Sequence, residues 1–159
     1  MMTFNKDLAN KKLTVVRTFN APVDKVWKAW TDAAILDQWW GPKPWRAETK
    51  IMDFKTGGYW LYAMIGPDGS KTWSKVSFSN VNAQSFETAV IFCDEDGNPV
   101  NSFGASSHWQ IAMEQKEQVT TVTVVLTFDN TAALEKLVAM GFEGGFTMGL
   151  NQLEELLAA

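Results

Sequence analysis

The sequence has one cysteine and one histidine among its 159 residues, which leaves few side chains for metal binding or disulfide chemistry. Cys93 has no partner for an internal disulfide and no neighbour at the spacing of a metal ligand. We therefore interpret it as a small buried hydrophobe in a protein of a reducing compartment. Since no His, Cys or Asp residues stand at ligand spacing, we expect no metal and no cofactor.

Long apolar runs and clusters of basic residues are absent as well. No segment approaches the roughly 18 apolar residues of a membrane-spanning helix, and residues 1–12 contain no apolar stretch of the kind found in a signal peptide. The formal net charge is −4, and the 14 Lys and Arg residues form no long run. Binding to nucleic-acid phosphates needs clustered basic residues. We expect a cytoplasmic protein with no membrane span and no nucleic-acid partner.

Aromatic residues, in contrast, are abundant, with 8 Trp and 10 Phe. Large flat side chains supply much apolar area to a core or to a pocket, and composition alone leaves both interpretations open. The length, with 46% hydrophobic and 20% charged residues, is typical of one globular domain. We expect a single domain over residues 1–159, with its core at residues 11–158.

The apolar periodicity predicts an α+β domain. Alternation of apolar and polar residues indicates strands, and apolar residues at i, i+3, i+4 and i+7 indicate helices. The turns of the central region are too short for parallel crossovers, so they join about seven antiparallel strands in all. The predicted order is a strand at 11–19, helices at 23–30 and 32–40, strands within 45–128, a short helix at 131–140 and a long helix at 142–157.

Two stretches resemble the family related to the activator of the heat-shock chaperone ATPase: RTFNAPVDKVWKAWTDAAILDQWWGP at residues 17–42 and GFEGGFTMGLNQLEELL at residues 141–157. Asp53 with Gly57-Gly58 before a strand, and a Pro-Asp-Gly hairpin at residues 67–69, extend the resemblance over nearly the whole chain. That family belongs to the START-like, or birch-pollen-allergen-like, superfamily. The resemblance implies a helix-grip fold, in which a curved antiparallel sheet wraps around a long C-terminal helix, with two short helices after the first strand.

A row of glycines marks the last predicted helix, because Gly141, Gly145 and Gly149 recur every four residues along one edge of its apolar stripe. An interior helical glycine costs about 1 kcal/mol relative to alanine, so the row needs a compensating reason. Either the sheet approaches the helix backbone closely, or the missing side chains leave room for a guest molecule. Both explanations remain open at this point.

If the row leaves room for a guest, the apolar faces of the strands and of the last helix enclose a cavity suited to a lipid-like or aromatic molecule. An ordinary core would draw on the same residues. The predicted cavity residues are Trp60, Tyr62, Met64, Val76, Phe78, Val90, Phe92, Trp109, Ile111, Phe142, Gly145, Phe146, Gly149 and Leu150.

Arg17 is a charged residue that the alternation places among buried positions, in phase with Leu13 and Val15. A guanidinium on the apolar side needs a carboxylate partner, which Asp53 or Glu48 could supply. Two roles remain open for Arg17 and Asp53. They form a structural ion pair, or they provide a polar anchor for the head group of a ligand.

The single histidine, His108, is the obvious candidate for acid-base catalysis. Alternation along its strand places Phe103, Ala105, Trp109 and Ile111 on one face and His108 on the other. We therefore expect His108 to face solvent and to have no catalytic role, and no other catalytic group is apparent.

Three functional interpretations follow. The first is a non-enzymatic protein that binds a small hydrophobic molecule in an internal cavity. The second, which the resemblance implies, is a co-chaperone-like or stress-response module whose partner is a chaperone. The third is a polyketide-cyclase-like enzyme, which would need Tyr62, His108 or Arg17 to converge inside the cavity.

Overall fold

Eight strands and four helices make up the part of the chain that the structure, a computed structural model, describes: residues 2–100 and 107–158. The strands are β1 (Met2–Asp7), β2 (Lys12–Phe19), β3 (Arg46–Met52), β4 (Tyr59–Ile65), β5 (Lys71–Ser79), β6 (Ser85–Cys93), β7 (Ser107–Lys116) and β8 (Val119–Phe128). The helices are α1 (Val23–Thr31), α2 (Ala33–Trp39), α3 (Thr131–Ala139) and α4 (Phe142–Ala158).

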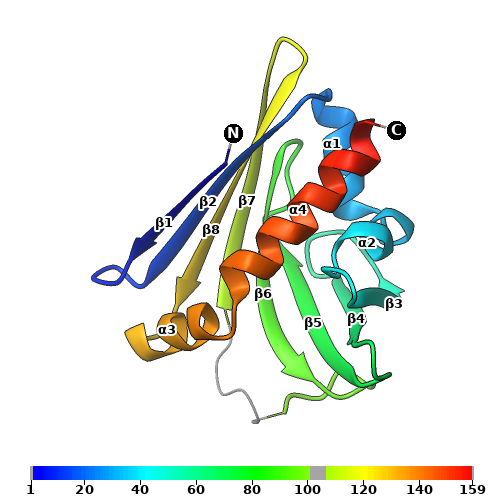
Figure 1. Cartoon of the computed structure of the whole chain (residues 1–159), viewed down its shortest axis with the longest axis vertical. Coiled ribbons are helices and arrows are strands. Elements are labelled where there is room, and N and C mark those ends of the chain that lie inside the picture. The colour runs from blue at the N-terminus through cyan, green and yellow to red at the C-terminus, as the bar shows by residue number, and fades with distance from the viewer. Residues whose placement is uncertain (1, 101–106, 159) are drawn as a thin grey trace.

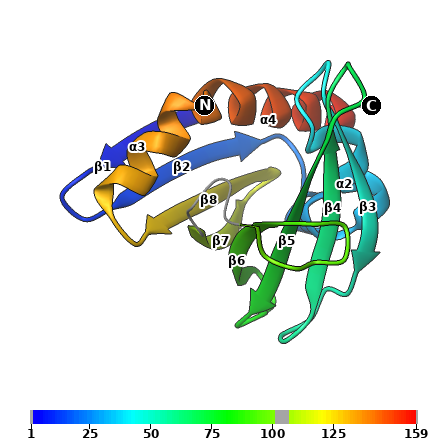
Figure 2. The same ribbon diagram turned by 90° about the horizontal axis from the view of Figure 1, so that it is seen from below.

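The strands form one sheet in the order β1-β2-β8-β7-β6-β5-β4-β3, and neighbouring strands are antiparallel. The sheet curls around α4, which crosses it diagonally (Figures 1 and 2). Helices α1 and α2 lie beside the C-terminal end of α4, and α3 lies beside its N-terminal end (Figure 1). This arrangement confirms the helix-grip fold. In the ranges that the structure describes, no helix has the length and apolar character needed to traverse a bilayer.

The strand count is eight rather than about seven, because the sequence analysis missed β1. This strand pairs with β2 at the edge of the sheet, with Met2 opposite Arg17 and Phe4 opposite Val15. Met2 and Phe4 pack against the core but are only partly buried, and the other side chains of the strand are polar. An edge strand with so few apolar residues gives a weak alternation signal.

The corner between α1 and α2 is fixed by Asp32. Its side-chain carboxylate accepts hydrogen bonds from the backbone N–H groups of Ala34 (2.9 Å) and Ile35 (3.3 Å) at the start of α2. The backbone N–H of Asp32 meanwhile donates to the carbonyl of Lys28 and closes α1. One residue thus ends the first helix and caps the second, which brings the tryptophans of both helices together.

The inner face of the sheet carries the core. In β8 the residues Val122, Val124 and Leu126 are buried and their neighbours are less so, as their alternation predicts. In β7 Trp109 and Ile111 are buried on the same inner face. Phe103 and Ala105, which the sequence analysis assigned to that strand, lie outside the described residues.

Candidate functional site

A cavity of about 270 Å³, called here the outer cavity, lies between the middle of the sheet and the helices α3 and α4. Its lining is predominantly apolar. From the strands and the segment after α2 come Trp40, Pro42, Tyr62, Met64, Ser74, Val90, Phe92, Ser107, Trp109 and Phe128. From α3, α4 and their junction come Ala133, Lys136, Leu137, Met140, Phe142, Gly145 and Phe146.

A smaller space of about 50 Å³, called here the inner pocket, lies deeper in the core. It is lined by Trp30, Leu36, Trp40, Trp60, Tyr62, Val76, Phe78, Phe86, Thr88, Val90, Trp109 and Ile111. Four of these residues, Trp40, Tyr62, Val90 and Trp109, also line the outer cavity. The two spaces therefore adjoin, with those four side chains between them.

Packed aromatic rings hold the shared wall in place, and Trp40 is at their centre. Its ring makes edge contacts with the rings of Trp60, at 5.5 Å between centroids, and Phe146, at 6.2 Å. The ring of Trp60 stacks on that of Tyr62 at 4.1 Å. Aromatic pairs at these separations are favourable beyond their buried area, so the wall between the two spaces is well defined.

Tyr62 contributes the one phenol of the two spaces. The indole Nε1 of Trp40 donates a hydrogen bond of 2.9 Å to its hydroxyl. Burial raises the pKa of the Tyr62 phenol, and hydrogen bonds with Trp40 and Ser74 oppose that rise. The phenol therefore keeps its proton at neutral pH. Among the described lining residues, Tyr62 and Lys136 are the only titratable side chains.

Twelve of the fourteen predicted cavity residues line one or both spaces. The exceptions are Gly149 and Leu150, which are buried in α4 away from them. The structure thus gathers the twelve residues around the outer cavity and the inner pocket, and their contact with a ligand stays a prediction.

Several lining residues were missed by the sequence analysis, and they come from helices, from strands and from the segments between them. Ala133, Leu137 and Met140 recur at i, i+4 and i+7, so their spacing could have identified the side of α3 that borders the outer cavity. Trp40 falls inside the helix predicted at 32–40 but follows the end of α2 in the structure. Thr88 carried no signal, because a threonine in a strand most often faces water.

The three glycines of the predicted row have three different environments. Gly141 precedes α4 and has a φ of +86°, a conformation that glycine adopts easily and that ends α3. Gly145 lines the outer cavity, and a Cβ built on it would meet only Pro42 Cγ, at 3.8 Å. A Cβ on Gly149 would lie 3.3 Å from the carbonyl oxygen of Trp39. Close approach therefore explains Gly149, and open space explains Gly145.

The predicted ion pair of Arg17 with Asp53 or Glu48 is wrong. Arg17 is buried, as expected, but its Nη2 lies 3.0 Å from Oε2 of Glu154 in α4. Asp53 instead pairs with Lys55, and Glu48 with Arg46, all on exposed side chains. The carboxylate that Arg17 needs comes from the helix that crosses the sheet. Neither Arg17 nor Asp53 lines the outer cavity or the inner pocket, so a role as a ligand anchor has no support from their positions.

His108 lies on the outer face of the sheet, as its alternation with the buried Trp109 predicts. Its side chain is 45% exposed, and its Nε2 lies 3.1 Å from Oε1 of Glu87. Glu87 also accepts hydrogen bonds from Asn80 and Gln110. Asn80 above all, with His108 and Gln110, lowers the pKa of Glu87 to about 2. This cluster is separated from both spaces by the sheet.

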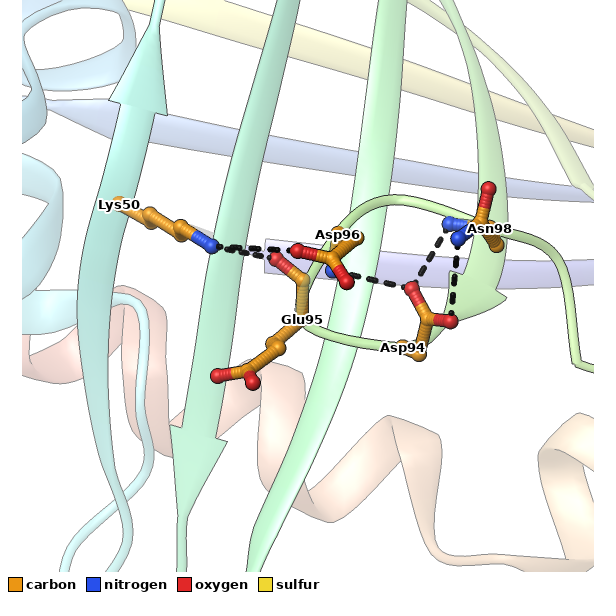
Figure 3. Close-up of polar contacts among 5 residues, drawn as sticks. All are labelled: Lys50, Asp94, Glu95, Asp96 and Asn98. Carbon is orange, nitrogen blue, oxygen red and sulfur yellow. Dashed lines mark hydrogen bonds and ion pairs between the residues drawn. The ribbon is translucent and has the colours of Figure 1, made fainter.

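The acidic run after β6 forms a hairpin tip (Figure 3). Oδ1 of Asp94 accepts the backbone N–H groups of Asp96 and Asn98, both at 2.9 Å. Nζ of Lys50 donates to the backbone carbonyl of Glu95 at 2.8 Å and lies 3.9 Å from Oδ1 of Asp96. Within residues 2–100 and 107–158, no group of three or more His, Cys, Asp or Glu side chains is placed to hold a metal ion.

Comparisons with known proteins agree with this architecture. The family model described as "Activator of Hsp90 ATPase homolog 1-like protein" matches residues 20–158. A solved structure of a protein from Arthrobacter aurescens is 32% identical, with 98% of this chain and 91% of that chain covered and a TM-score of 0.91. A protein from Mycobacterium smegmatis is 31% identical, with 99% and 98% covered and a TM-score of 0.89.

The AHSA1 protein from Silicibacter pomeroyi is similar in fold alone, at 22% identity, with 92% of this chain and 97% of that chain covered and a TM-score of 0.70. No curated protein matches the chain.

Proposed function

Because the chain belongs to the family of Activator of Hsp90 ATPase homolog 1-like proteins, for which ligand binding and chaperone association are the candidate functions, we propose that it binds a small hydrophobic molecule in the outer cavity. The ligand is lipid-like or aromatic, and it is bound without being chemically changed. The observation that carries this proposal is the outer cavity itself, about 270 Å³ of space with a predominantly apolar lining.

The size of the cavity indicates the size of the ligand. An apolar cavity of about 150 Å³ in another protein accommodates benzene, and pockets for drug-sized ligands start at about 300 Å³. A space of about 270 Å³ therefore suits two or three aromatic rings or a short alkyl chain. Two indole N–H groups in its wall donate to neighbouring hydroxyls, Trp40 Nε1 to Tyr62 and Trp109 Nε1 to Ser107, both at 2.9 Å. Water in the cavity is then poorly held, and its displacement favours an apolar guest.

The titratable groups of the lining support binding over catalysis. Tyr62 has a raised pKa and keeps its proton, so it can offer a hydrogen bond but is a poor base. His108 and Glu87 form their contact on the other side of the sheet. The polar groups required by a polyketide-cyclase-like enzyme do not converge among the described residues of the cavity.

Two adjacent glycines of α4 provide a matched test. Gly145 borders the outer cavity, whereas a Cβ on the exposed Gly144 would meet nothing within 4 Å. Both replacements by leucine remove a helical glycine, but only Gly145→Leu places its side chain in the cavity. With N-phenyl-1-naphthylamine as a neutral fluorescent probe, we expect Gly145→Leu to weaken binding at least about tenfold and Gly144→Leu to leave it unchanged. Equal binding by both variants would reject the outer cavity as the site.

The description of the family favours a second candidate, association with a chaperone ATPase. Such a contact uses the outer surface of the protein, which Gly145→Leu does not alter. If association is the function, the purified protein changes the rate of a chaperone ATPase, and Gly145→Leu changes it equally. An ATPase rate that does not respond to the protein leaves ligand binding as the remaining candidate.

A further inference from the structure

The inner pocket contains two buried polar groups that lack a hydrogen-bond partner among the described residues. They are Nε1 of Trp30, in α1, and Oγ1 of Thr88, in β6. The two residues are 5% and 3% exposed, and both line the inner pocket. Native proteins pair nearly all of their buried polar groups, because an unpaired group loses its bonds to water without replacement.

The neighbours of these two groups show how well the rest of the core is paired. Of the other tryptophans that line the inner pocket, Trp40 donates to Tyr62, Trp60 to Oγ1 of Thr49, and Trp109 to Ser107. The buried hydroxyl of Thr120, elsewhere in the core, donates to the carbonyl of Ala21 at 2.7 Å. The two exceptions therefore occur together, in one small space.

We propose that the inner pocket receives an uncharged oxygen of the ligand, which accepts hydrogen bonds from Trp30 Nε1 and Thr88 Oγ1. This inference rests on the proposed function, because the apolar body of the same ligand occupies the adjoining outer cavity. The pocket of about 50 Å³ exceeds the roughly 10–15 Å³ that one water molecule needs, so it has room for a carbonyl, ether or hydroxyl group.

The charge of the pocket decides between a neutral oxygen and a carboxylate. No cationic side chain is present among the described residues that line the inner pocket. A carboxylate there would be desolvated without a counter-ion, which is strongly unfavourable. The cation Lys136 lines the outer cavity instead. The ligand class is thus a hydrophobic molecule with a neutral oxygen at its buried end.

Three two-ring probes isolate the oxygen. In 2-acetylnaphthalene the carbonyl can reach the inner pocket, 2-isopropenylnaphthalene has the same shape with a CH₂ group in place of the oxygen, and 2-naphthoate carries a charge. Each probe is measured by displacement of N-phenyl-1-naphthylamine from the full chain. We expect the acetyl compound to bind about tenfold more tightly than the isopropenyl compound, as two hydrogen bonds provide, and the naphthoate to bind most weakly.

Two variants that each remove one donor then assign the preference: Thr88→Val is near-isosteric, and Trp30→Phe keeps an aromatic ring while it removes the indole N–H. Thr88→Val and Trp30→Phe should each reduce the tenfold ratio to about threefold, because each removes one of the two hydrogen bonds. Binding of 2-isopropenylnaphthalene to Thr88→Val should not weaken. Thr120→Val removes a buried hydroxyl that is already paired and lines neither space, so it should keep the full ratio.

The outcomes separate this inference from the proposed function. If the two neutral probes bind wild-type protein equally, or the naphthoate binds best, the inference fails and the cavity proposal stands. The inference fails in the same way if Thr88→Val and Trp30→Phe both keep the tenfold ratio, since the oxygen is then recognised elsewhere. If N-phenyl-1-naphthylamine does not bind the full chain, the cavity proposal fails and takes the inference with it; if it binds but none of the three probes displaces it, the inference alone fails. Should one variant not fold, the other still carries the test.

Discussion

Replacing Gly145 with alanine adds one methyl group to the side of α4 that borders the outer cavity. The added Cβ would lie 3.8 Å from Cγ of Pro42, an ordinary van der Waals contact. Alanine in a helix interior is favoured over glycine by about 0.5–1 kcal/mol. With no clash to oppose that gain, we expect Gly145→Ala to raise the free energy of unfolding by about 0.5–1 kcal/mol.

Two other glycines of α4 serve as controls. A Cβ on Gly144 meets nothing within 4 Å, so Gly144→Ala should be stabilising by a similar amount. A Cβ on Gly149 would lie 3.3 Å from the carbonyl oxygen of Trp39, which Gln152 also holds by a hydrogen bond of 3.0 Å. Since Trp39 is fully buried and cannot easily move, Gly149→Ala should be destabilising by about 1–3 kcal/mol.

Urea unfolding of the three variants gives the signs directly, and thermal unfolding should show shifts of about 2–4 °C per kcal/mol for a chain of this length. A destabilised Gly145→Ala beside a stabilised Gly144→Ala would mean that no open space borders Gly145, and the reasoning from the outer cavity would be refuted.

Three further predictions concern ionisable side chains. Glu154→Gln should lower the free energy of unfolding by about 1–2 kcal/mol, because it leaves the buried Arg17 without its carboxylate, and the 57% exposure of Glu154 limits the effect. Arg17→Met should lower the free energy of unfolding by less. The reverse order in urea unfolding would contradict this account. His108→Ala should change the stability by less than about 0.5 kcal/mol in the same assay, and a larger loss would give His108 a structural role. The pKa of Glu87 is lowered from 4.5 to about 2, chiefly by Asn80, so its stabilising contribution is present above pH 4.5 and is lost as the pH falls toward 2. Glu87→Gln should therefore lose less stability than wild type over that range, and parallel acid-unfolding curves would disprove the role of Glu87.

Local patterns made most of the fold predictable from the sequence. The alternation in β8 requires only that one face of a strand be buried, and Asp32 needs only its neighbours Ala34 and Ile35 to cap α2. The cavity residues of the strands follow from the same alternation once a curved sheet is assumed. Such signals lie within about ten residues of each other and do not depend on how distant segments meet.

Contacts between distant segments were not predictable in the same way. Glu154 lies 137 residues from Arg17, and the angle at which α4 crosses the sheet selects it over the nearer carboxylates. The β1 strand has too few apolar residues to be distinguished from a polar terminus. The sequence cannot show that Trp30 and Thr88 lack hydrogen-bond partners, because this requires the coordinates of every possible partner. Both residue types are usually paired when they are buried.

Native mass spectrometry of the purified chain mixed with N-phenyl-1-naphthylamine tests ligand binding in the outer cavity most directly. We predict a one-to-one complex for wild type and for Gly144→Leu, and little or none for Gly145→Leu at the same concentrations. Absence of a complex with wild type, or equal occupancy of all three proteins, would contradict the account.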